Sequence, residues 1–525
     1  MLDCSRNAVM KPQKIKEFVL ILKEFGYNSV MLYLEDTFEV GGEPMFGYLR
    51  GRYTKEELKD LDGFCNSVGM ELIPCVQTLA HLNAIFRWKE YAKINDINDV
   101  LLVEDERTYK LIDGIFETVE ECFTCKTVNI GLDEAHALGR GKYLDKFGYQ
   151  DRFELFSSHL QKVNDLAKKR GLTPILWSDT FFEKGADGVP YANLNVPECA
   201  VKALPDNVEL VCWDYYHTNK DFYDTVLDAH KQFNNPLWYA CSAYSSRGFA
   251  PCNAYSLKAI RPAMQSCRER GVNNIIVTMW GGNGAECSFF ALLPSLLFAV
   301  ETFNGNDDIN SIAQKFKDIT GEDFFNMMSL DLPNDVGAKG LNYGPSKYML
   351  YNDPFAGIYD CTINPSDSKT YENIAKTLYQ NGKDSKYKYV FDCLALLSEI
   401  LAKKYTLGLD TRKAYNERDI KGLKGLVKRY GEIISLVEKF SLVFKKQWFT
   451  DNKPHGFDVQ DLRLGGLIQR LISCRTRLNE LIKGKTNAIE ELDEPILDLE
   501  TGTSEFSKQT VVLNDWKTNV TVNIL

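Results

Sequence analysis

Short apolar runs alternate with segments of helical spacing over the first three hundred residues of the chain. Each unit starts with a run rich in β-forming residues and continues with apolar residues that recur every three or four positions. The pattern predicts eight strands, at residues 1–5, 29–36, 71–78, 127–134, 174–179, 208–216, 236–243 and 274–281. Nearly continuous apolar strands that alternate with helices are typical of parallel sheets covered on both faces. Eight such units favour an α/β fold, a (β/α)8 TIM barrel, over an open doubly wound sheet.

The helical segments contain residues that start and stop helices. Pro12 suits a first helical position and Gly26 a left-handed cap, which predicts a helix between them. Thr54 and Glu57 form a capping box, and Gly69 ends the helix that they begin. The segment before the fourth strand is long and residues 185–200 are irregular, so we expect insertions on the rim of the barrel.

Beyond residue 305 the pattern becomes that of long amphipathic helices. Apolar residues spaced by threes and fours occur at Leu423, Leu426, Tyr430, Ile433, Val437 and Phe440, at Leu464, Leu467, Leu471, Leu478 and Leu481, and along residues 391–402. Residues 511–513 and 520–524, around Asn514-Asp515, form a candidate β-hairpin. We predict a catalytic barrel over residues 1–305 and a mainly α-helical domain over residues 306–525, which covers the barrel or pairs two chains as a homodimer.

Composition narrows the class of protein. A chain of 525 residues exceeds the roughly 250 to 300 residues that one core supports, in agreement with two domains. The net charge of -10 argues against nucleic acid or an anionic membrane as the main partner. No apolar run approaches the roughly 20 residues of a membrane span, and the N-terminus lacks the pattern of a secretory signal. Because the fourteen cysteines occur mostly singly in apolar segments, we expect buried thiols and a cytoplasmic protein.

Metal-ligand patterns are absent from the sequence. The six histidines are spread out, and no His-x-His or His–carboxylate cluster occurs. The Cys-x-x-Cys pair at residues 122–125 has no second pair beside it. We therefore expect neither a metal nor a cofactor.

Two adjacent carboxylates, Asp133 and Glu134, follow the apolar run at residues 127–130. Side chains alternate across a strand, so neighbouring acids can face one substrate only where the strand ends and its backbone turns. A paired Asp and Glu in such a place suits the acid/base chemistry that cleaves sugars.

Polar and aromatic residues also follow the other predicted strands, at the end of the barrel where such enzymes hold their chemistry. In chain order they are Arg6, Asp36, His81, Trp177, Asp179, Trp213, Asp214, Tyr215, Tyr216, Tyr244, Trp280, Asn283 and Glu286. Three tryptophans at equivalent positions predict an aromatic box against which sugar rings pack. For Arg6 a structural ion pair, and for His81 a core histidine, are open alternatives.

In order, several of these segments resemble the active-site segments of glycoside hydrolase family 20, the β-N-acetylhexosaminidases. They are Asp3-Cys4-Ser5-Arg6-Asn7, Leu34-Glu35-Asp36, the segment around His81, Gly131-Leu132-Asp133-Glu134, Leu176-Trp177, Val211-Cys212-Trp213 and Met279-Trp280-Gly281. The resemblance covers about residues 1–305. The long helical tail is similar to that of the bacterial intracellular branch of the family, which favours the exo-acting glucosaminidases.

The resemblance implies hydrolysis of terminal β-linked N-acetylglucosamine or N-acetylgalactosamine from an oligosaccharide or glycoside, with retention, by attack of the sugar's own acetamide oxygen. Glu134 is then the general acid and later the base, and Asp133 orients the acetamide. Tyr244 donates to the acetamide oxygen, with Tyr215 or Tyr216 as substitutes.

The resemblance also assigns binding and supporting roles. Trp177, Trp213 and Trp280 wall the sugar, with Asp214 beside them, and Asp36 and His81 support the catalytic pair. Arg6 binds the 3- and 4-hydroxyls, and Glu286 the 4- or 6-hydroxyl. In the family, an acid usually follows Met-Trp-Gly directly. Here Gly282-Asn283 stands in its place, so Asn283 is a further candidate for binding the sugar near its 4- or 6-hydroxyl.

Two other functions are compatible with the residues alone. One is a barrel glycosidase that pairs Glu134 with Asp179 or Glu286 and acts on sugars without an acetamido group. The other is a non-catalytic sugar-binding barrel whose helical tail serves assembly.

Overall fold

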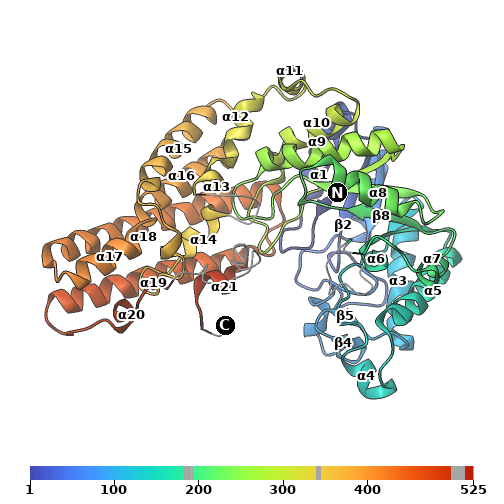
Figure 1. The fold of residues 1–525 in the computed structure, drawn as a ribbon, viewed down its shortest axis with the longest axis horizontal. Coiled ribbons are helices and arrows are strands. Elements are labelled where there is room, and N and C mark those ends of the chain that lie inside the picture. Colours follow the sequence, from blue (N-terminus) through green and yellow to red (C-terminus); the bar gives the residue numbers. More distant parts are fainter. Residues whose placement is uncertain (183–190, 192, 338–343, 498–514, 524–525) are drawn as a thin grey trace. The chain divides into compact units, whose positions relative to one another are not determined.

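The structure, a computed structural model, describes residues 1–182, 191, 193–337, 344–497 and 515–523. The chain forms two compact units (Figure 1). The first, here called the barrel unit, comprises residues 1–243, 256–279 and 295–312. The second, the helical unit, comprises residues 244–255, 280–294 and 313–525. The segments that follow the last two strands of the barrel, residues 244–255 and 280–294, are thus grouped with the helices. A single domain boundary near residue 305 stays a prediction.

Eight parallel strands form the sheet of the barrel unit. They are β1 (Leu2–Asp3), β2 (Ser29–Tyr33), β3 (Glu71–Cys75), β6 (Thr127–Asn129), β7 (Thr173–Trp177), β8 (Glu209–Trp213), β9 (Leu237–Ser242) and β10 (Asn274–Thr278), paired in that order. A parallel bridge between Leu2 and Met279 joins the first strand to the chain just past the last. The prediction of a (β/α)8 barrel is confirmed.

Helices connect successive strands of the barrel. They are α1 (Pro12–Phe25), α2 (Lys55–Ser67), α3 (Glu106–Cys122), α5 (Arg152–Lys169), α8 (Lys220–His230) and α9 (Asn253–Arg270), and α10 (Leu293–Phe303) follows the last strand. Pro12 begins α1 and Gly26, at φ 103°, caps it, as predicted. The Thr54–Glu57 capping box is present at the start of α2, and Gly69 follows its end at φ 75°.

The rim of the barrel unit contains the expected insertions. After β3 come the 3-10 helices Ile85–Arg87 and Ala92–Ile94 and an antiparallel ribbon of β4 (Asn95–Ile97) and β5 (Val100–Leu101). The others are α4 (Lys142–Phe147) after β6, and α6 (Asp179–Phe182) and α7 (Glu198–Ala203) after β7. Residues 183–190 and 192 of the last insertion lie outside the described residues.

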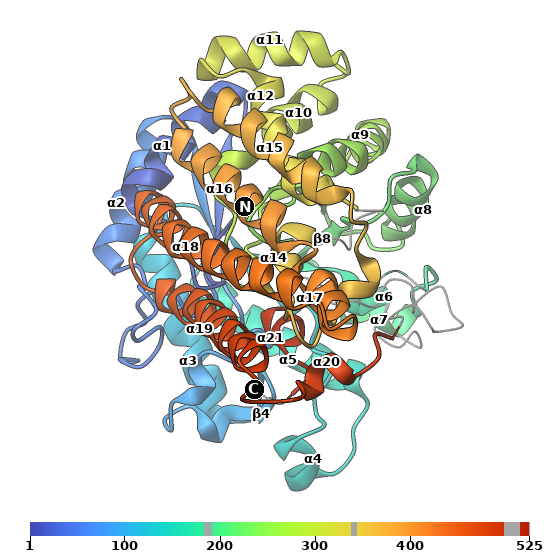
Figure 2. The ribbon, with the colours of Figure 1, turned by 90° about the vertical axis from the view of Figure 1, so that its left-hand side faces the viewer.

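The helical unit is built from antiparallel helices with apolar faces. They are α11 (Ile309–Thr320, shared with the barrel unit), α12 (Phe324–Met328), α13 (Leu332–Asp335), α14 (Pro345–Tyr351), α15 (Asp367–Asn381), α16 (Lys388–Lys404), α17 (Leu407–Asn416), α18 (Ile420–Asp451), α19 (Phe457–Ile482), α20 (Glu490–Asp493) and α21 (Trp516–Val520). The 3-10 helices Phe289–Leu292, Ser329–Asp331 and Asp360–Thr362 complete it. The long helices α18 and α19 lie side by side (Figure 2). The apolar residues predicted to line α18 are all buried.

The end of the chain differs from the predicted hairpin. Residues 511–513, its first strand, lie outside the described residues, and residues 516–520 form the helix α21. Asp515 caps this helix by accepting from the backbone N–H of Lys517 at 3.1 Å, which favours a helical turn over a hairpin at this point.

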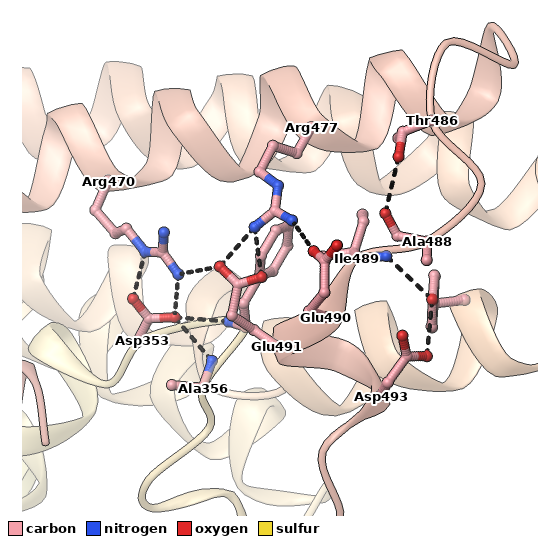
Figure 3. A network of polar contacts seen from close by, with 12 residues as sticks. Asp353, Ala356, Arg470, Arg477, Thr486, Ala488, Ile489, Glu490, Glu491 and Asp493 are labelled. Atoms are coloured by element: carbon pink, nitrogen blue, oxygen red, sulfur yellow. Dashed lines mark hydrogen bonds and ion pairs between the residues drawn. The ribbon is translucent and has the colours of Figure 1, made fainter.

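A network of ion pairs joins α19 to α20 and to Asp353, which lies just after α14 (Figure 3). Arg470 binds Asp353 through two nitrogens, at 2.5 and 3.0 Å, and lies 3.7 Å from Glu491. Arg477 pairs with Glu491 and, at 2.8 Å, with Glu490. Arg–carboxylate forks of this geometry hold α20 beside α19.

Two global properties complete the fold. Across the described residues, no helix is both long and apolar enough to cross a bilayer. All fourteen cysteines are free thiols, and most are buried.

Candidate active site

Asp133 and Glu134 lie in the turn that follows β6 in the barrel unit. The strand itself ends at Asn129, earlier than predicted, because Gly131, Leu132 and Glu134 have φ angles of 72°, 71° and 52°. Positive φ values break the alternation of a strand. Two successive acids can therefore turn toward the same group, as the sequence analysis required.

Gly131 makes this turn possible. A Cβ atom at this position would lie 2.0 Å from the side-chain oxygen of Gln77, so only glycine fits. The backbone N–H of Gly131 donates to Oδ1 of Asn129 at 2.9 Å, which fixes the start of the turn.

His81 joins the two acids. Its Nε2 lies 3.3 Å from Oδ2 of Asp133 and 3.6 Å from Oε2 of Glu134. On its other side, the backbone N–H of His81 donates to Oδ2 of Asp99 at 3.0 Å, and Nδ1 lies 3.8 Å from the same oxygen. An imidazolium between three carboxylates holds both acids of the pair in place.

A chain of hydrogen bonds runs from Asp133 across the ends of β3 and β2. Gln77 Nε2 donates to Oδ1 of Asp133 at 3.4 Å and to the hydroxyl of Tyr33 at 3.0 Å. That hydroxyl donates to Glu35 at 3.1 Å. Glu35 pairs in turn with Arg6 at 3.4 Å, so the strand-end residues form one connected polar layer.

A cavity of about 400 Å³ opens beside His81. It is lined by Arg6, Glu35, His81, Asn83, Asn98 and Asp99. The Arg6 side chain is 39% exposed and that of Glu134 is 50% exposed, whereas that of Asp133 is only 13% exposed. The exposed acid, Glu134, is suited to transfer protons, and the shielded acid, Asp133, is suited to keep a fixed charge beside it.

The two acids have pKa values shifted in opposite directions. Burial and the neighbouring Asp133 carboxylate raise the pKa of Glu134. Burial would also raise the pKa of Asp133, but the charge and hydrogen bond of His81 bring it below its ordinary value. Burial acts to lower the pKa of His81, yet the Asp133 carboxylate raises it to about 9. At neutral pH, His81 is charged and Asp133 ionised, while Glu134 is the acid that keeps a proton more readily.

An aromatic cluster follows β7 and β8. The Trp213 indole N–H donates to Oδ1 of Asp179 at 3.1 Å, and the Trp213 ring lies 5.2 Å from that of Tyr215. Tyr216 is 52% exposed, whereas Trp177 is only 1% exposed. Trp213 and Tyr215 are each only 8% exposed, so Tyr216 is the exposed ring of this cluster.

Asp214 binds its own loop. Its carboxylate accepts from the backbone N–H groups of Tyr216 and His217 at 3.1 and 3.0 Å, and its Oδ2 lies 3.0 Å from Nδ1 of His217. The Tyr223 hydroxyl donates to it at 3.3 Å. The carboxylate therefore shapes the turn that contains Tyr215 and Tyr216. Its contact with substrate stays a prediction.

Asp36, which follows β2, is buried and binds an arginine. It pairs with Arg50 at 3.2 Å, and Arg50 also donates to the backbone oxygen of Ser5 at 2.5 Å. The carboxylate that binds the backbone of His81 is Asp99, in the turn between β4 and β5. The role of Asp36 as a support of the catalytic pair stays a prediction.

Four predicted site residues belong to the helical unit, although they follow β9 and β10 in the chain. Tyr244 is buried and lies edge-on to Tyr255, with ring centres 5.4 Å apart. Trp280 begins the segment that contains Asn283 and Glu286.

Glu286 does not face solvent. Its side chain is 2% exposed, and its Oε1 lies 2.8 Å from Nζ of Lys347 and 3.0 Å from Nη1 of Arg463. Asn283 accepts from Arg463 at 2.7 Å through its side-chain oxygen. Both side chains thus bind partners within the helical unit, and their binding of sugar hydroxyls stays a prediction.

The sequence analysis missed Asp99, Glu35 and Gln77 as parts of the site. Glu35 and Gln77 stand at predicted strand ends, which is the feature that could have identified them. Within the described part of the chain, no group of three or more His, Cys, Asp and Glu residues is arranged to hold a metal ion.

Two models of protein families match the sequence of this chain. The model of the family described as "Glycosyl hydrolase family 20, catalytic domain" matches residues 1–231, and that of the "Glycoside Hydrolase 20C C-terminal domain" matches residues 322–512. The chain belongs to glycoside hydrolase family 20. In this family 20 chain, the first match includes Asp133, Glu134 and His81, and the second includes Lys347 and Arg463.

Among the relatives of this family 20 chain are two proteins named hexosaminidase D. The human protein is 23% identical over 250 residues, which are 46% of this chain and 49% of that protein. The Bos taurus protein is 22% identical over 219 residues, which are 40% of this chain and 60% of that protein. The chain thus spans about half the length of the curated relatives it matches. A solved structure of an exo β-N-acetylglucosaminidase from Vibrio harveyi is 15% identical, with a TM-score of 0.47, and covers 63% of this chain and 58% of that one.

Proposed function

We propose that this family 20 chain is an exo-acting β-N-acetylhexosaminidase that removes terminal β-linked N-acetylglucosamine or N-acetylgalactosamine with retention. The observation that carries the proposal is the convergence of Asp133 and Glu134 on one histidine, at 3.3 and 3.6 Å, with opposite pKa shifts. Asp133 is held ionised while Glu134 keeps a proton more readily than an ordinary glutamate, which is what a substrate-assisted mechanism needs.

In the first step, the carbonyl oxygen of the substrate's acetamido group attacks the anomeric carbon as the bond to the leaving oxygen breaks. Glu134 gives its proton to that leaving oxygen. Asp133 accepts the acetamide N–H and faces the positive charge that develops on the oxazolinium ring. Because Asp133 is shielded and ionised, it can stabilise this charge without being protonated itself.

In the second step, water attacks the anomeric carbon of the oxazolinium ion and the ring bond to the acetamide oxygen breaks. The Glu134 carboxylate takes the proton of that water, which returns both groups to their starting states. Two displacements at one carbon leave the sugar with its original anomeric configuration.

The remaining residues bind the sugar in this proposal. Arg6, exposed at the cavity and oriented by Glu35, is suited to fork onto the 3- and 4-hydroxyls. Trp213 with Tyr215 offers an aromatic face for the acetamide end of the sugar. Tyr244 and Trp280 keep their proposed roles as donor to the acetamide oxygen and sugar wall, on the basis of their places directly after β9 and β10.

The two-carboxylate alternative is disfavoured by the partners of its second acid. Asp179 is buried and accepts from the Trp213 indole. Glu286 is buried against Lys347 and Arg463. Either carboxylate would have to leave its partners before it could attack carbon or activate water.

Location and assembly form the last part of the proposal. Fourteen free thiols support a reducing, cytoplasmic environment. On the exposed faces of α18 and α19, Leu442 and Leu462 are 71% and 73% exposed, which supports pairing of two chains through the helical unit.

A panel of chromogenic β-glycosides that differ at C2 and C4 tests the proposed function. The proposal predicts turnover of the 2-acetamido gluco or galacto compounds and at least a thousandfold less with the 2-hydroxy compounds, because only the former contain the nucleophile. Equal turnover of both classes would favour a two-carboxylate glycosidase, and no turnover of any would favour a sugar-binding barrel.

A further inference from the structure

The antiparallel ribbon of β4 and β5 binds the segment that contains His81 at three points. The backbone N–H of His81 donates to Oδ2 of Asp99 at 3.0 Å, and that of Leu82 donates to the backbone oxygen of Asp99 at 3.2 Å. The backbone N–H of Leu101 donates to the backbone oxygen of Leu79 at 2.8 Å. The ribbon therefore fixes the backbone on both sides of His81.

His81 needs this support because its backbone is strained. Its φ angle is 60°, in the left-handed region that residues with a Cβ rarely adopt. Such a conformation persists only where the surrounding contacts hold it. From this conformation, Nε2 of His81 lies near both Asp133 and Glu134. The contact made by the N–H of His81 itself is the one with the Asp99 carboxylate.

The same ribbon also holds the chain that follows Glu134. Asp96, in β4, is 4% exposed, and its carboxylate accepts from the backbone N–H groups of Gly139 and Tyr143 at 2.9 and 2.7 Å. The backbone of Gly141 approaches β4 so closely that a Cβ there would lie 2.3 Å from the backbone oxygen of Asp96. As a result, β4 lies beside α4 (Figure 1). The ribbon is thus fastened to both of the loops that meet at the imidazole.

From these contacts we propose that Asp99 is a positioning residue for the catalytic pair. Its carboxylate holds His81 in the left-handed conformation that brings the imidazole to Asp133 and Glu134. This inference rests on the proposed function, since it assigns the ribbon a part in the chemistry of those two acids. Asp99 acts through His81 and takes no part in proton transfer itself.

Two variants, Asp99→Asn and Asp99→Ala, separate the hydrogen bond from the charge. Asparagine keeps a side-chain oxygen that can accept from the backbone N–H of His81, whereas alanine has no such oxygen. Both variants remove the charge that lies 3.8 Å from Nδ1 of His81. The difference between the two variants therefore reports the hydrogen bond alone.

Asp151→Ala is the matched control. Asp151 also accepts from backbone N–H groups, those of Phe153 and Glu154 at 2.9 and 3.2 Å, but it does so at the start of α5. This variant removes a carboxylate of the same kind from the barrel unit and leaves the contacts of His81 in place.

The first measurement is the ionisation of His81, followed by NMR of the histidine side chains, with His81→Asn to identify its signal. Burial acts to lower the pKa of His81, and the Asp133 carboxylate raises it to about 9. Arg6 and Glu35 also act on it, in opposite directions, and both are unchanged in the variants. In Asp99→Ala the imidazole moves away from Asp133, so the pKa of His81 should fall toward its ordinary range. Asp99→Asn and Asp151→Ala should keep a pKa close to that of the wild type.

The second measurement is kcat/KM on a 2-acetamido aryl glycoside. We expect Asp99→Ala to lower kcat/KM by about ten- to a hundredfold, because a displacement of about 1 Å in an active site can have an effect of that size. Its pH profile should move upward, since a displaced imidazolium no longer lowers the pKa values of Asp133 and Glu134. A variant that is only less stable loses folded enzyme and keeps the wild-type profile. Asp99→Asn should keep kcat/KM close to the wild-type value.

The positioning role is wrong if Asp99→Ala keeps the wild-type pKa of His81 and the wild-type pH profile, or if Asp99→Asn is changed as much as Asp99→Ala. Asp99→Gly, which also lacks an acceptor and suits any backbone conformation of the turn, replaces the alanine variant if that variant does not fold, with the same two outcomes. If the wild-type enzyme does not hydrolyse 2-acetamido glycosides, the proposed function has failed. The pKa of His81 in the variants still decides whether Asp99 positions the imidazole.

Discussion

His81 Nε2 lies 3.3 Å from Oδ2 of Asp133, and this pair sets the charge state of the whole site. The carboxylate raises the pKa of His81 to about 9, and the imidazolium lowers that of Asp133. Glu134, 3.6 Å from the same nitrogen, is left as the acid with a raised pKa. The predictions below follow from this division of charge between two adjacent carboxylates.

Replacing Glu134 with glutamine should lower kcat on unactivated substrates by about two to four powers of ten, the usual weight of general acid catalysis. The amide keeps the shape of the side chain but has no proton to give. Steady-state kinetics would measure the loss. Glu104→Gln is the control, because Glu104 pairs with Lys162 elsewhere on the barrel unit and should not affect turnover. Wild-type rates in Glu134→Gln would remove its role as the acid.

Asp133→Asn should also lower kcat by about two to three powers of ten, because it removes the negative charge that faces the oxazolinium ion. A thiazoline mimic of the cyclised intermediate should bind the wild-type enzyme tightly and the variant weakly. Inhibition constants for the two proteins give the comparison. Equal affinity in both would mean that Asp133 does not contact the acetamide arm.

His81→Asn should move the pH profile of kcat/KM toward higher pH. The charge of His81 lowers the pKa values of both Asp133 and Glu134, so its removal raises both. Activity requires Asp133 ionised and Glu134 protonated, and therefore the acidic limb and the basic limb both shift upward. A profile that stays in place, or moves to lower pH, would contradict the assigned charges.

The strands and helices were predictable because the patterns that indicate them involve only residues close together in the chain. Eight apolar runs, the capping box at Thr54 and the face of α18 follow from residues close together in the chain. The end of β6 was placed too late, because the sequence pattern does not show the positive φ angles at Gly131, Leu132 and Glu134 that follow the strand.

The positions of Asp133, Glu134 and Arg6 were predictable for the same reason, because each follows a strand. The partner of His81 was not, since Asp99 comes from a turn inside an insertion. Nor was the burial of Glu286, whose partner Arg463 lies 177 positions further along the chain. An acid near a predicted strand end can bind a ligand, or it can pair with a basic side chain from a distant part of the chain. The sequence alone does not distinguish these two cases.

Gly131→Ala should lower the free energy of unfolding by about 1–3 kcal/mol, because it adds a Cβ at a positive φ angle and against Gln77. Activity should fall with it, since Gln77 holds Asp133. Gly63→Ala is the control: Gly63 lies inside α2 with open space around it, and alanine there should stabilise by about 0.4–1 kcal/mol. Chemical denaturation measures both changes. An unaltered midpoint for Gly131→Ala would contradict the described turn.

The attack of the substrate's own acetamide oxygen is the central claim, and a series of aryl N-acylglucosaminides tests it most directly. Replacing the acetyl hydrogens with one, two and three fluorines withdraws electrons from the carbonyl oxygen and makes it a poorer nucleophile. We predict that kcat/KM falls steeply with each fluorine, while the chemistry of Glu134 is unchanged. A rate that does not depend on the number of fluorines would show that the acetamide does not attack, and would contradict the mechanism.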